Sequence, residues 1–326
     1  MPRKNVFAIG CFVLFATLLG TGTTLAQIAD PPVGATDSNK ASVAPLIDVA
    51  QLKSMLAERA SIRLIDVGTE QRDYAQRHIP GAQFVHWIDD IIDAKKPERY
   101  NLIDAVKMQS LLRRLGIANE DHIVLYDNFS SRLATRFYWS LKVYNHRNVS
   151  VLNGGLLAWT NQGGALSRQM PTTTPSDYQV KQANPAFAVD MDFVKRSLGN
   201  PKVTLIDGRP AEQFSGEAPG KVFHTGKAHK LSGHIPGAVH VFWKDNFNED
   251  GTFKSIDALR SLYKKAGVET VADQTVVTYC NEGLHAAPPW FVLRELLGVS
   301  DVRVYDDSMS EWGNSDQPVH KGSAAK

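Results

Sequence analysis

Short apolar runs alternate with amphipathic segments along most of this chain. In its second half, apolar runs of strand length cover residues 202–207, 239–242, 275–280 and 302–305. Amphipathic helical patterns cover residues 191–198, 256–266 and 288–297. This alternation predicts an α/β fold, with a parallel sheet covered by helices on both faces. In such sheets, ligands bind beyond the carboxyl ends of the strands.

The same series of segments occurs twice. His78-Ile79-Pro80-Gly81-Ala82 recurs 156 residues later as His234-Ile235-Pro236-Gly237-Ala238, and Trp87 recurs as Trp243 at the same offset. Val124-Leu125-Tyr126-Asp127 aligns with Val277-Thr278-Tyr279-Cys280 at an offset of 153. We therefore predict two copies of one unit, at residues 45–162 and 187–318. Residues 163–186, rich in small and polar residues, are predicted to be a linker.

The second copy contains an insertion of about 15 residues between its first strand and its His-Ile-Pro-Gly-Ala segment. It lies around residues 216–232 and carries several basic or titratable side chains: Lys221, His224, Lys227, His229 and Lys230. Loops of this length often serve function, whereas a solvated excursion is the simpler alternative. The sequence leaves both open.

The N-terminus has the layout of a secretory signal peptide. Arg3 and Lys4 precede an apolar run from Val6 to Gly20, and small residues end at Ala26. The alternative is a membrane anchor, but about 15 apolar residues fall short of the roughly 20 that span a bilayer. We therefore predict cleavage after residues 1–26, export, and a periplasmic location with no membrane attachment afterwards.

Composition describes an ordinary globular protein of 326 residues, 43% hydrophobic and 21% charged. Without residues 1–26, the basic residues fall from 36 to 34, which equals the 34 acidic ones. A formally neutral chain argues against nucleic acid or an anionic membrane as partner.

Cys280 is then the one remaining cysteine and has no partner for an internal disulfide. It is either an inert buried cysteine or a reactive thiol.

The position of Cys280 favours a reactive thiol. It ends an apolar run and opens a short loop that leads into a helical pattern with Pro288 and Pro289 at its start. Loop N–H groups and the positive helix end favour a thiolate over a thiol. Gly283 suits a tight loop because it has no Cβ. The alternative is a simple strand-to-helix connection, which leaves the cysteine unexplained.

With these features the chain resembles a tandem-domain rhodanese of the thiosulfate and 3-mercaptopyruvate sulfurtransferase group. The resemblance covers nearly all of the mature chain. Its specific marks are the two His-Ile-Pro-Gly-Ala segments, the loop 279–283 and the segment 304–312. It implies two rhodanese-like α/β domains, a nucleophile in the second only, and no metal or organic cofactor. Asp127, at the nucleophile's place in the first copy, agrees with this.

The implied reaction moves sulfane sulfur from a small anionic donor, thiosulfate first, to a thiophilic acceptor such as cyanide or a thiol. Cys280 would carry the sulfur as a persulfide between two displacement steps. The loop would bind the donor and the terminal sulfur through its backbone N–H groups, and its predicted site residues are Asn281, Glu282, Gly283, Leu284, His285 and Ala286. Arg209 matches the family's substrate-binding arginine; its alternative role is an ion pair with Asp207 or Glu212.

The loop departs from the family pattern because it holds no Arg or Lys. Glu282 would oppose a dianionic donor unless it faces solvent or a base. His285 can compensate when protonated or act as an acid or base, and the alternative is a surface histidine without a role. These departures leave the donor open, with a 3-mercaptopyruvate type second to thiosulfate.

Other candidates receive structural interpretations. His78 and His234 are predicted to bond backbone groups at strand entries. Asp306, Asp307 and Ser308 are predicted to form a turn or helix cap, although they can line the interdomain cleft. Arg132 and Arg136 are expected in ion pairs on a helix surface, although they can reach the second copy's site. The remaining aromatic residues are expected in the core or at the domain interface rather than in a ligand cage: Trp87, Trp159, Trp243, Trp290 and Trp312.

Two rivals belong to other classes. A non-catalytic carrier would hold a persulfide on Cys280 for a partner, and Glu282 together with the absent basic residues favours it. A cysteine phosphatase would need an arginine six residues after the cysteine, where Ala286 stands. The sequence leaves open whether a protein accepts the sulfur.

Overall fold

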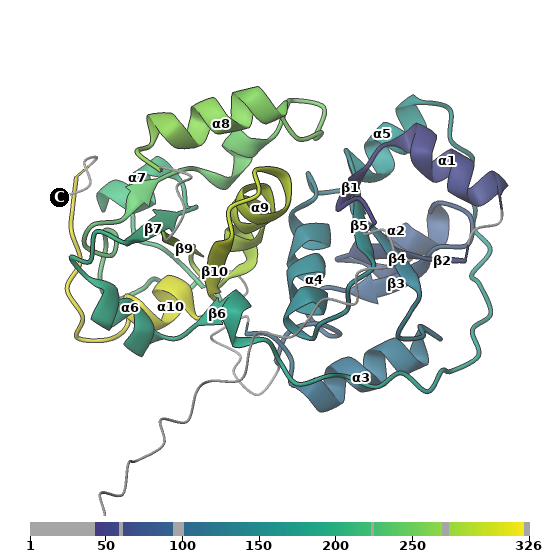
Figure 1. The fold of residues 1–326 in the computed structure, drawn as a ribbon, viewed down its shortest axis with the longest axis horizontal. Helices are drawn as coiled ribbons and strands as arrows, with labels where there is room; N and C mark the ends of the chain where they lie inside the picture. Colours follow the sequence, from purple (N-terminus) through teal and green to yellow (C-terminus); the bar gives the residue numbers. More distant parts are fainter. Residues whose placement is uncertain (1–42, 59–60, 94–100, 223–224, 269–273, 323–326) are drawn as a thin grey trace, which may run out of the picture. The chain divides into compact units, whose positions relative to one another are not determined.

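Each half of the chain forms a parallel five-stranded sheet, and the two sheets have the same topology (Figure 1). The first has the order β1-β5-β4-β2-β3, with strands Leu46–Ile47 (β1), Ile62–Gly68 (β2), Gln83–His86 (β3), His122–Tyr126 (β4) and Val149–Leu152 (β5). The second has the order β6-β10-β9-β7-β8, with strands Ala188–Val189 (β6), Val203–Asp207 (β7), Val239–His240 (β8), Thr275–Tyr279 (β9) and Asp301–Tyr305 (β10). The predicted fold of two tandem α/β repeats is therefore confirmed.

The computed structural model describes residues 43–58, 61–93, 101–222, 225–268 and 274–322. The predicted signal peptide at residues 1–26 and His224 of the insertion lie outside these ranges. Within them, none of the helices has the length and apolar character needed to span a bilayer. All the described residues belong to one compact unit, residues 42–326.

Helices cover both faces of each sheet. In the first half they are Val49–Ala57 (α1), Gln71–Gln76 (α2), Ala105–Arg114 (α3), Arg132–Val143 (α4) and Gly155–Asn161 (α5). In the second half they are Met191–Ser197 (α6), Ala211–Ser215 (α7), Ile256–Lys265 (α8), Ala287–Phe291 (α9) and Ser308–Trp312 (α10). A π-helical turn, Val292–Leu296, continues α9. The sequence patterns did not separate the short elements β1, β6, α7 and α10, which are two to five residues long.

Burial on both faces explains why consecutive positions of the central strands are apolar. Ile65 and Val67 of β2 pack with α3 and α4, whereas Leu64 packs with α1 and α5. In the second half, Val276 packs with α8 and α9, and Val277 packs with α6 and α10. Each fully buried aliphatic side chain contributes roughly 1.5–3 kcal/mol.

The predicted linker contains no helix or strand between residues 162 and 184, but it is held against the first half. Tyr178 is buried, and its hydroxyl lies 3.0 Å from His146 Nδ1. Ser167 forms an isolated bridge with His78. Small and polar composition therefore marks an absence of regular structure here and not an absence of packing.

The histidines of the repeated segments are structural, as predicted. His78 Nδ1 lies 2.7 Å from the carbonyl oxygen of Tyr74, and its ring stacks on that tyrosine. His234 Nδ1 lies 2.8 Å from the carbonyl oxygen of Phe214 and stacks on its ring at 3.8 Å. Both imidazoles are fully buried, so they tie a helix to the start of the following strand.

A buried ion pair joins the two halves. Arg136 of α4 is completely buried and pairs with Asp306, which follows β10. The other oxygen of Asp306 accepts a hydrogen bond from the N–H of Leu102 at 2.8 Å. Close by, Tyr138 of α4 packs edge-on against Phe291 of α9 at 4.9 Å. The expectation of a helix-surface ion pair for Arg136 is therefore wrong, because this face of α4 packs on the second half.

Arg136→Met should destabilise the protein because it leaves Asp306 as a buried carboxylate without its cation. We expect the free energy of unfolding to fall by about 3 kcal/mol, measured by urea denaturation. The double variant Arg136→Met/Asp306→Leu should recover most of this loss, since it removes both buried charges. A single variant as stable as the unmodified protein would contradict a structural role for the pair.

Candidate active site

Cys280 follows β9 directly, at the carboxyl end of the central strand pair, as predicted. Its side chain is 1% exposed. The backbone N–H groups of Glu282, His285 and Ala286 hydrogen-bond the sulfur. These donors come from the loop and from the 3-10 turn Leu284–Ala286, which leads into α9. The predicted backbone N–H donors are therefore present around the thiol, and we call this set of donors the cradle.

Gly283 allows the loop to turn this tightly. It has a φ of +80°, which lies in the left-handed region that favours glycine. A Cβ at this position would clash with Asp306 Oδ1. Leu284 and Ala286, the next predicted site residues, are buried and form the 3-10 turn.

Ser308 fixes the loop from the far side, and sequence reasoning missed this role. Its hydroxyl accepts hydrogen bonds from the N–H groups of Cys280 and Gly283, both at 3.1 Å. It donates to the carbonyl oxygen of Tyr305 at 2.8 Å. Ser308 adopts a φ of +51°, which is strained for a residue with a Cβ. The distinctive segment 304–312 was the available signal, but a turn or cap was inferred from it.

The prediction that the loop keeps Cys280 ionised at neutral pH is wrong for this structure. Burial, together with the nearby negative charge of Glu282, raises the pKa of the thiol to about 11. The three backbone hydrogen bonds act in the opposite direction but do not compensate for the lost solvation. The resting cysteine is therefore a thiol, and its deprotonation becomes part of any reaction.

His285 also differs from expectation. Its ring lies flat on Trp243, with centroids 4.7 Å apart and planes 6° apart. Burial, together with the charges of Arg132 and Lys244, lowers the pKa of His285 to about 3. The imidazole is therefore neutral at physiological pH and does not compensate for Glu282. It is neither a charged group nor an idle surface histidine, because it forms part of the wall of the site.

A cavity of about 460 Å³, which we call the Cys280 cavity, opens beside the sulfur. Of the residues that the structure describes, three cationic ones line it: Arg132 of α4, Lys221 of the insertion, and Lys244. The charge that the loop lacks is thus supplied by three distant segments. Arg132 was expected in a helix-surface ion pair, but its Nη1 lies 3.3 Å from His285 Nε2 inside this cavity.

Aromatic side chains form much of the remaining wall. Trp87, Phe242 and Trp243 all line the cavity, although the two tryptophans are no more than 4% exposed. The two tryptophans were expected in the core or at the domain interface, and they belong to the core as well as to the cavity wall. The result is a cavity lined by aromatic rings and by cationic side chains.

The insertion contributes to the site, which favours its functional interpretation over a solvated excursion. Lys221, Val222 and Gly226 line the Cys280 cavity. His229 Nε2 lies 3.3 Å from Asn281 Oδ1. Asn281 also donates from Nδ2 to Gln213 Oε1 at 2.9 Å, so the insertion and α7 hold this loop residue together.

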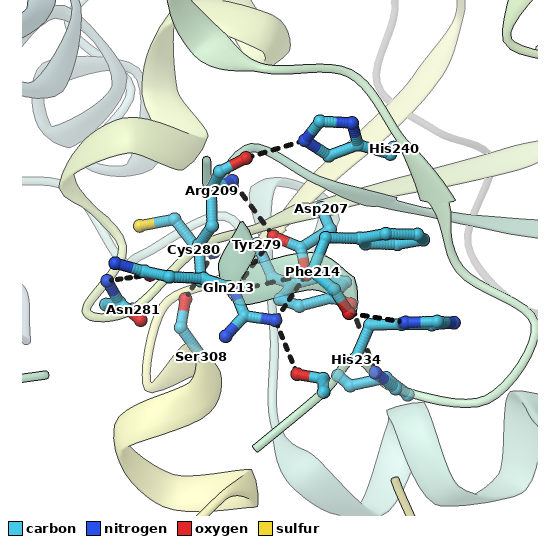
Figure 2. A network of polar contacts seen from close by, with 12 residues as sticks. Asp207, Arg209, Gln213, Phe214, His234, His240, Tyr279, Cys280, Asn281 and Ser308 are labelled. Carbon is cyan, nitrogen blue, oxygen red and sulfur yellow. Dashed lines mark hydrogen bonds and ion pairs between the residues drawn. The ribbon is translucent and has the colours of Figure 1, made fainter. Parts of the chain in front are cut away.

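Arg209 takes the alternative role that the sequence left open. Its guanidinium is 1% exposed and lies against Asp207, with Nη2 2.6 Å from Oδ2 (Figure 2). The same nitrogen donates to the carbonyl oxygen of Gly233 at 2.7 Å. Arg209 is not among the residues that line the Cys280 cavity. This geometry favours an ion pair within the second half over contact with a donor.

The first half keeps the same cradle but fills it with its own anion. Asp127, at the position of Cys280, is buried and accepts four backbone hydrogen bonds of 2.8–2.9 Å, from the N–H groups of Phe129, Ser131, Leu133 and Ala134. Burial nevertheless raises the pKa of Asp127. Across the described ranges, no cluster of three or more His, Cys, Asp or Glu side chains is arranged to hold a metal ion.

Comparison with known proteins agrees with this geometry. A profile for the Rhodanese-like domain matches residues 48–162 and 190–315. The chain is 33% identical over 276 residues to a Haloferax volcanii protein named "Putative thiosulfate sulfurtransferase", covering 84% of this chain and 93% of the relative. It is 33% identical over 269 residues to the sulfur carrier protein TtuD of Thermus thermophilus, covering 81% and 93%. The 3-mercaptopyruvate sulfurtransferase SseA of Escherichia coli shares the fold, with a TM-score of 0.70 at 24% identity over 82% of this chain and 99% of that one.

Alkylation of Cys280 by iodoacetamide should accelerate about tenfold per pH unit between pH 7 and 10, because only the thiolate reacts. Glu282→Gln removes a negative charge beside the sulfur and should lower the pKa of the thiol. We therefore expect up to about tenfold faster alkylation of this variant at pH 8, followed on the Cys280 peptide by mass spectrometry.

Glu212→Gln, at an exposed position of α7, is the matched control and should alkylate at the unmodified rate. An alkylation rate of the unmodified protein that is already constant above pH 7 would contradict the raised pKa.

Proposed function

Because the chain belongs to the rhodanese-like family of sulfurtransferases, we propose that it transfers sulfane sulfur from a small anionic donor through a persulfide on Cys280. The observation that carries this proposal is the cradle itself: three backbone N–H groups directed at one buried sulfur beside a cavity lined by cations. Such donors stabilise negative charge on sulfur, both in the thiolate and on the terminal atom of a persulfide.

The reaction can be written as two displacements. The Cys280 thiol loses its proton to solvent, and the thiolate attacks the outer sulfur of the donor. The donor's own bond to that sulfur breaks, and its electron pair leaves with the remainder of the donor, which is sulfite when the donor is thiosulfate. An acceptor nucleophile then attacks the terminal sulfur, and the bond between the two sulfurs breaks to return the thiolate. No external oxidant or reductant is required.

The Cys280 cavity supports an anionic donor. Arg132, Lys221 and Lys244 line it, and a low-dielectric aromatic wall strengthens their attraction for an anion. We place thiosulfate first because the Haloferax volcanii relative carries that name. A 3-mercaptopyruvate type remains second because its carboxylate can use the same cations and its carbon chain the aromatic wall. Turnover of the purified protein on each donor, compared side by side, decides between them.

Cys280→Ser should abolish sulfur transfer from every donor, because a hydroxyl cannot carry sulfane sulfur at this position. Thiocyanate formation from thiosulfate and cyanide is the measurement, with far-UV circular dichroism as the check on folding. Turnover by the Cys280→Ser variant at a rate close to that of the unmodified protein would remove Cys280 from the mechanism.

Arg132→Gln and Lys244→Gln should each raise KM for an anionic donor about three- to tenfold, because each removes a cation from the cavity lining. The kcat should change less, since neither side chain bonds the sulfur in the structure. Lys265→Gln, at an exposed position of α8, is the matched control. Equal KM values for all three variants would show that these cations do not bind the donor.

A persulfide carrier is the second candidate, and the high pKa of the buried thiol favours it. The similarity to a protein named sulfur carrier adds to this. Intact-mass measurement after thiosulfate treatment, read together with turnover, separates the two. A stable gain of about 32 Da, one sulfur atom, without release to cyanide or thiols supports the carrier. Rapid release supports the enzyme.

We further propose that the protein is exported to the periplasm, on the basis of residues 1–26. Cell fractionation and N-terminal sequencing of the mature chain test this. A mature protein that begins at Met1 and remains inside the cell would contradict export.

A further inference from the structure

The first half contains a cavity of about 590 Å³ at the carboxyl end of β2, which we call the Asp66 cavity. Asp66 lines it although this residue is only 4% exposed. Three aromatic rings, from Tyr74, Phe84 and Phe129, share the lining. The Cys280 cavity is separate, and the two have only Thr69 in common. Nothing in the proposed sulfur transfer uses the Asp66 cavity.

The second half shows what an aspartate at this position binds. Asp66 pairs in register with Tyr126, and Asp207 pairs in the same way with Tyr279. The hydroxyls of the two tyrosines accept equivalent bonds, from the N–H of Ile79 at 3.1 Å and of Ile235 at 3.2 Å. The two aspartates are therefore equivalent positions of the repeat. Asp207 holds the guanidinium of Arg209 through both carboxylate oxygens.

The first half lacks this internal guanidinium. Gly68 occupies the position of Arg209, two residues after the aspartate. A Cβ at Gly68 would lie 2.6 Å from a ring carbon of Phe84, so this ring fills the path that an arginine side chain would take. Among the described residues, no Lys or Arg forms an ion pair with Asp66. The carboxylate is retained while its cation is replaced by an open cavity.

We propose that the Asp66 cavity binds a small organic cation bearing a guanidinium group, seated on Asp66 as Arg209 is seated on Asp207. The carboxylate can accept two parallel N–H bonds from a planar guanidinium. The rings of Tyr74, Phe84 and Phe129 also line the cavity, so a bound cation would lie among aromatic side chains. Glu70 and Asp73 add negative charge to the lining, and Arg77 is its one cationic residue among those described.

The protonation of Asp66 gives the binding a distinctive pH dependence. Burial raises the pKa of Asp66 to about 7, against the effect of a hydrogen bond from Tyr126. A bound cation favours the carboxylate, so below pH 7 binding must first remove a proton. Affinity should therefore rise between pH 6 and pH 8. The charged or titratable groups that line the cavity or act on Asp66 are Glu70, Asp73, Tyr74, Arg77, Tyr126 and Asp127.

Isothermal titration of the full protein with methylguanidinium chloride tests the proposal, with N-methylurea as the neutral isostere and sodium chloride as the ionic-strength control. We expect a dissociation constant of about 1 mM at pH 8, a value typical of so small a ligand. Affinity should fall about tenfold at pH 6, and N-methylurea should not bind. Equal heats for the cation and the urea would overturn the proposal.

Two variants locate the site. Asp66→Asn keeps the side-chain shape and should weaken methylguanidinium binding at least tenfold, whereas Asp73→Asn at the exposed rim should weaken it less than about threefold.

Gly68→Arg in a Phe84→Ala background supplies the missing guanidinium and should block binding that the Phe84→Ala protein retains. Retained binding in Asp66→Asn, or in the filled variant when circular dichroism shows it folded, places the cation elsewhere and contradicts the assignment.

Thiocyanate formation is measured on the same variants. Asp66→Asn should keep the unmodified rate, because Asp66 does not line the Cys280 cavity. The two proposals therefore succeed or fail separately.

Discussion

The hydrogen bonds from backbone N–H groups to the atom at the end of the central strand organise both halves of this protein. In each half, a parallel sheet delivers one side chain to the point where a loop turns into a helix. The loop's N–H groups have no strand partner there, so they require an acceptor. The first half satisfies them with the carboxylate of Asp127 and the second with the sulfur of Cys280.

This shared constraint explains why the halves kept one architecture while they diverged in chemistry. A carboxylate carries its own charge and closes the first cradle. A thiol is a weaker acceptor, and a cavity of about 460 Å³ opens beside it. The strands β2 and β7 differ in the opposite way. Arg209 neutralises Asp207 at the end of β7, whereas no cation among the described residues pairs with Asp66 of β2. In the first half, backbone N–H groups satisfy Asp127, and a cavity opens beside Asp66. In the second half, Arg209 neutralises Asp207, and a cavity opens beside Cys280.

The electrostatics of the Cys280 site are distributed over the fold. The loop supplies neutral donors and one acidic side chain, while Arg132, Lys221 and Lys244 bring positive charge from three other segments. Burial raises the pKa of the thiol, while the cations line the cavity beside it. Ser308 and the Arg136–Asp306 pair hold the loop in place from behind.

The sequence by itself determined the duplicated α/β architecture and the position of Cys280, the candidate nucleophile. Both follow from local patterns: apolar runs of strand length, helical periodicity, and repeated segments that place Cys280 and Asp127 at the same strand end. Tertiary structure alone decided the environment of that cysteine. The ionisation of Cys280, the neutrality of His285 and the partner of Arg209 depend on burial and on charges brought together by the fold. Desolvation and Coulomb interactions act through space, so no local pattern in the sequence records them.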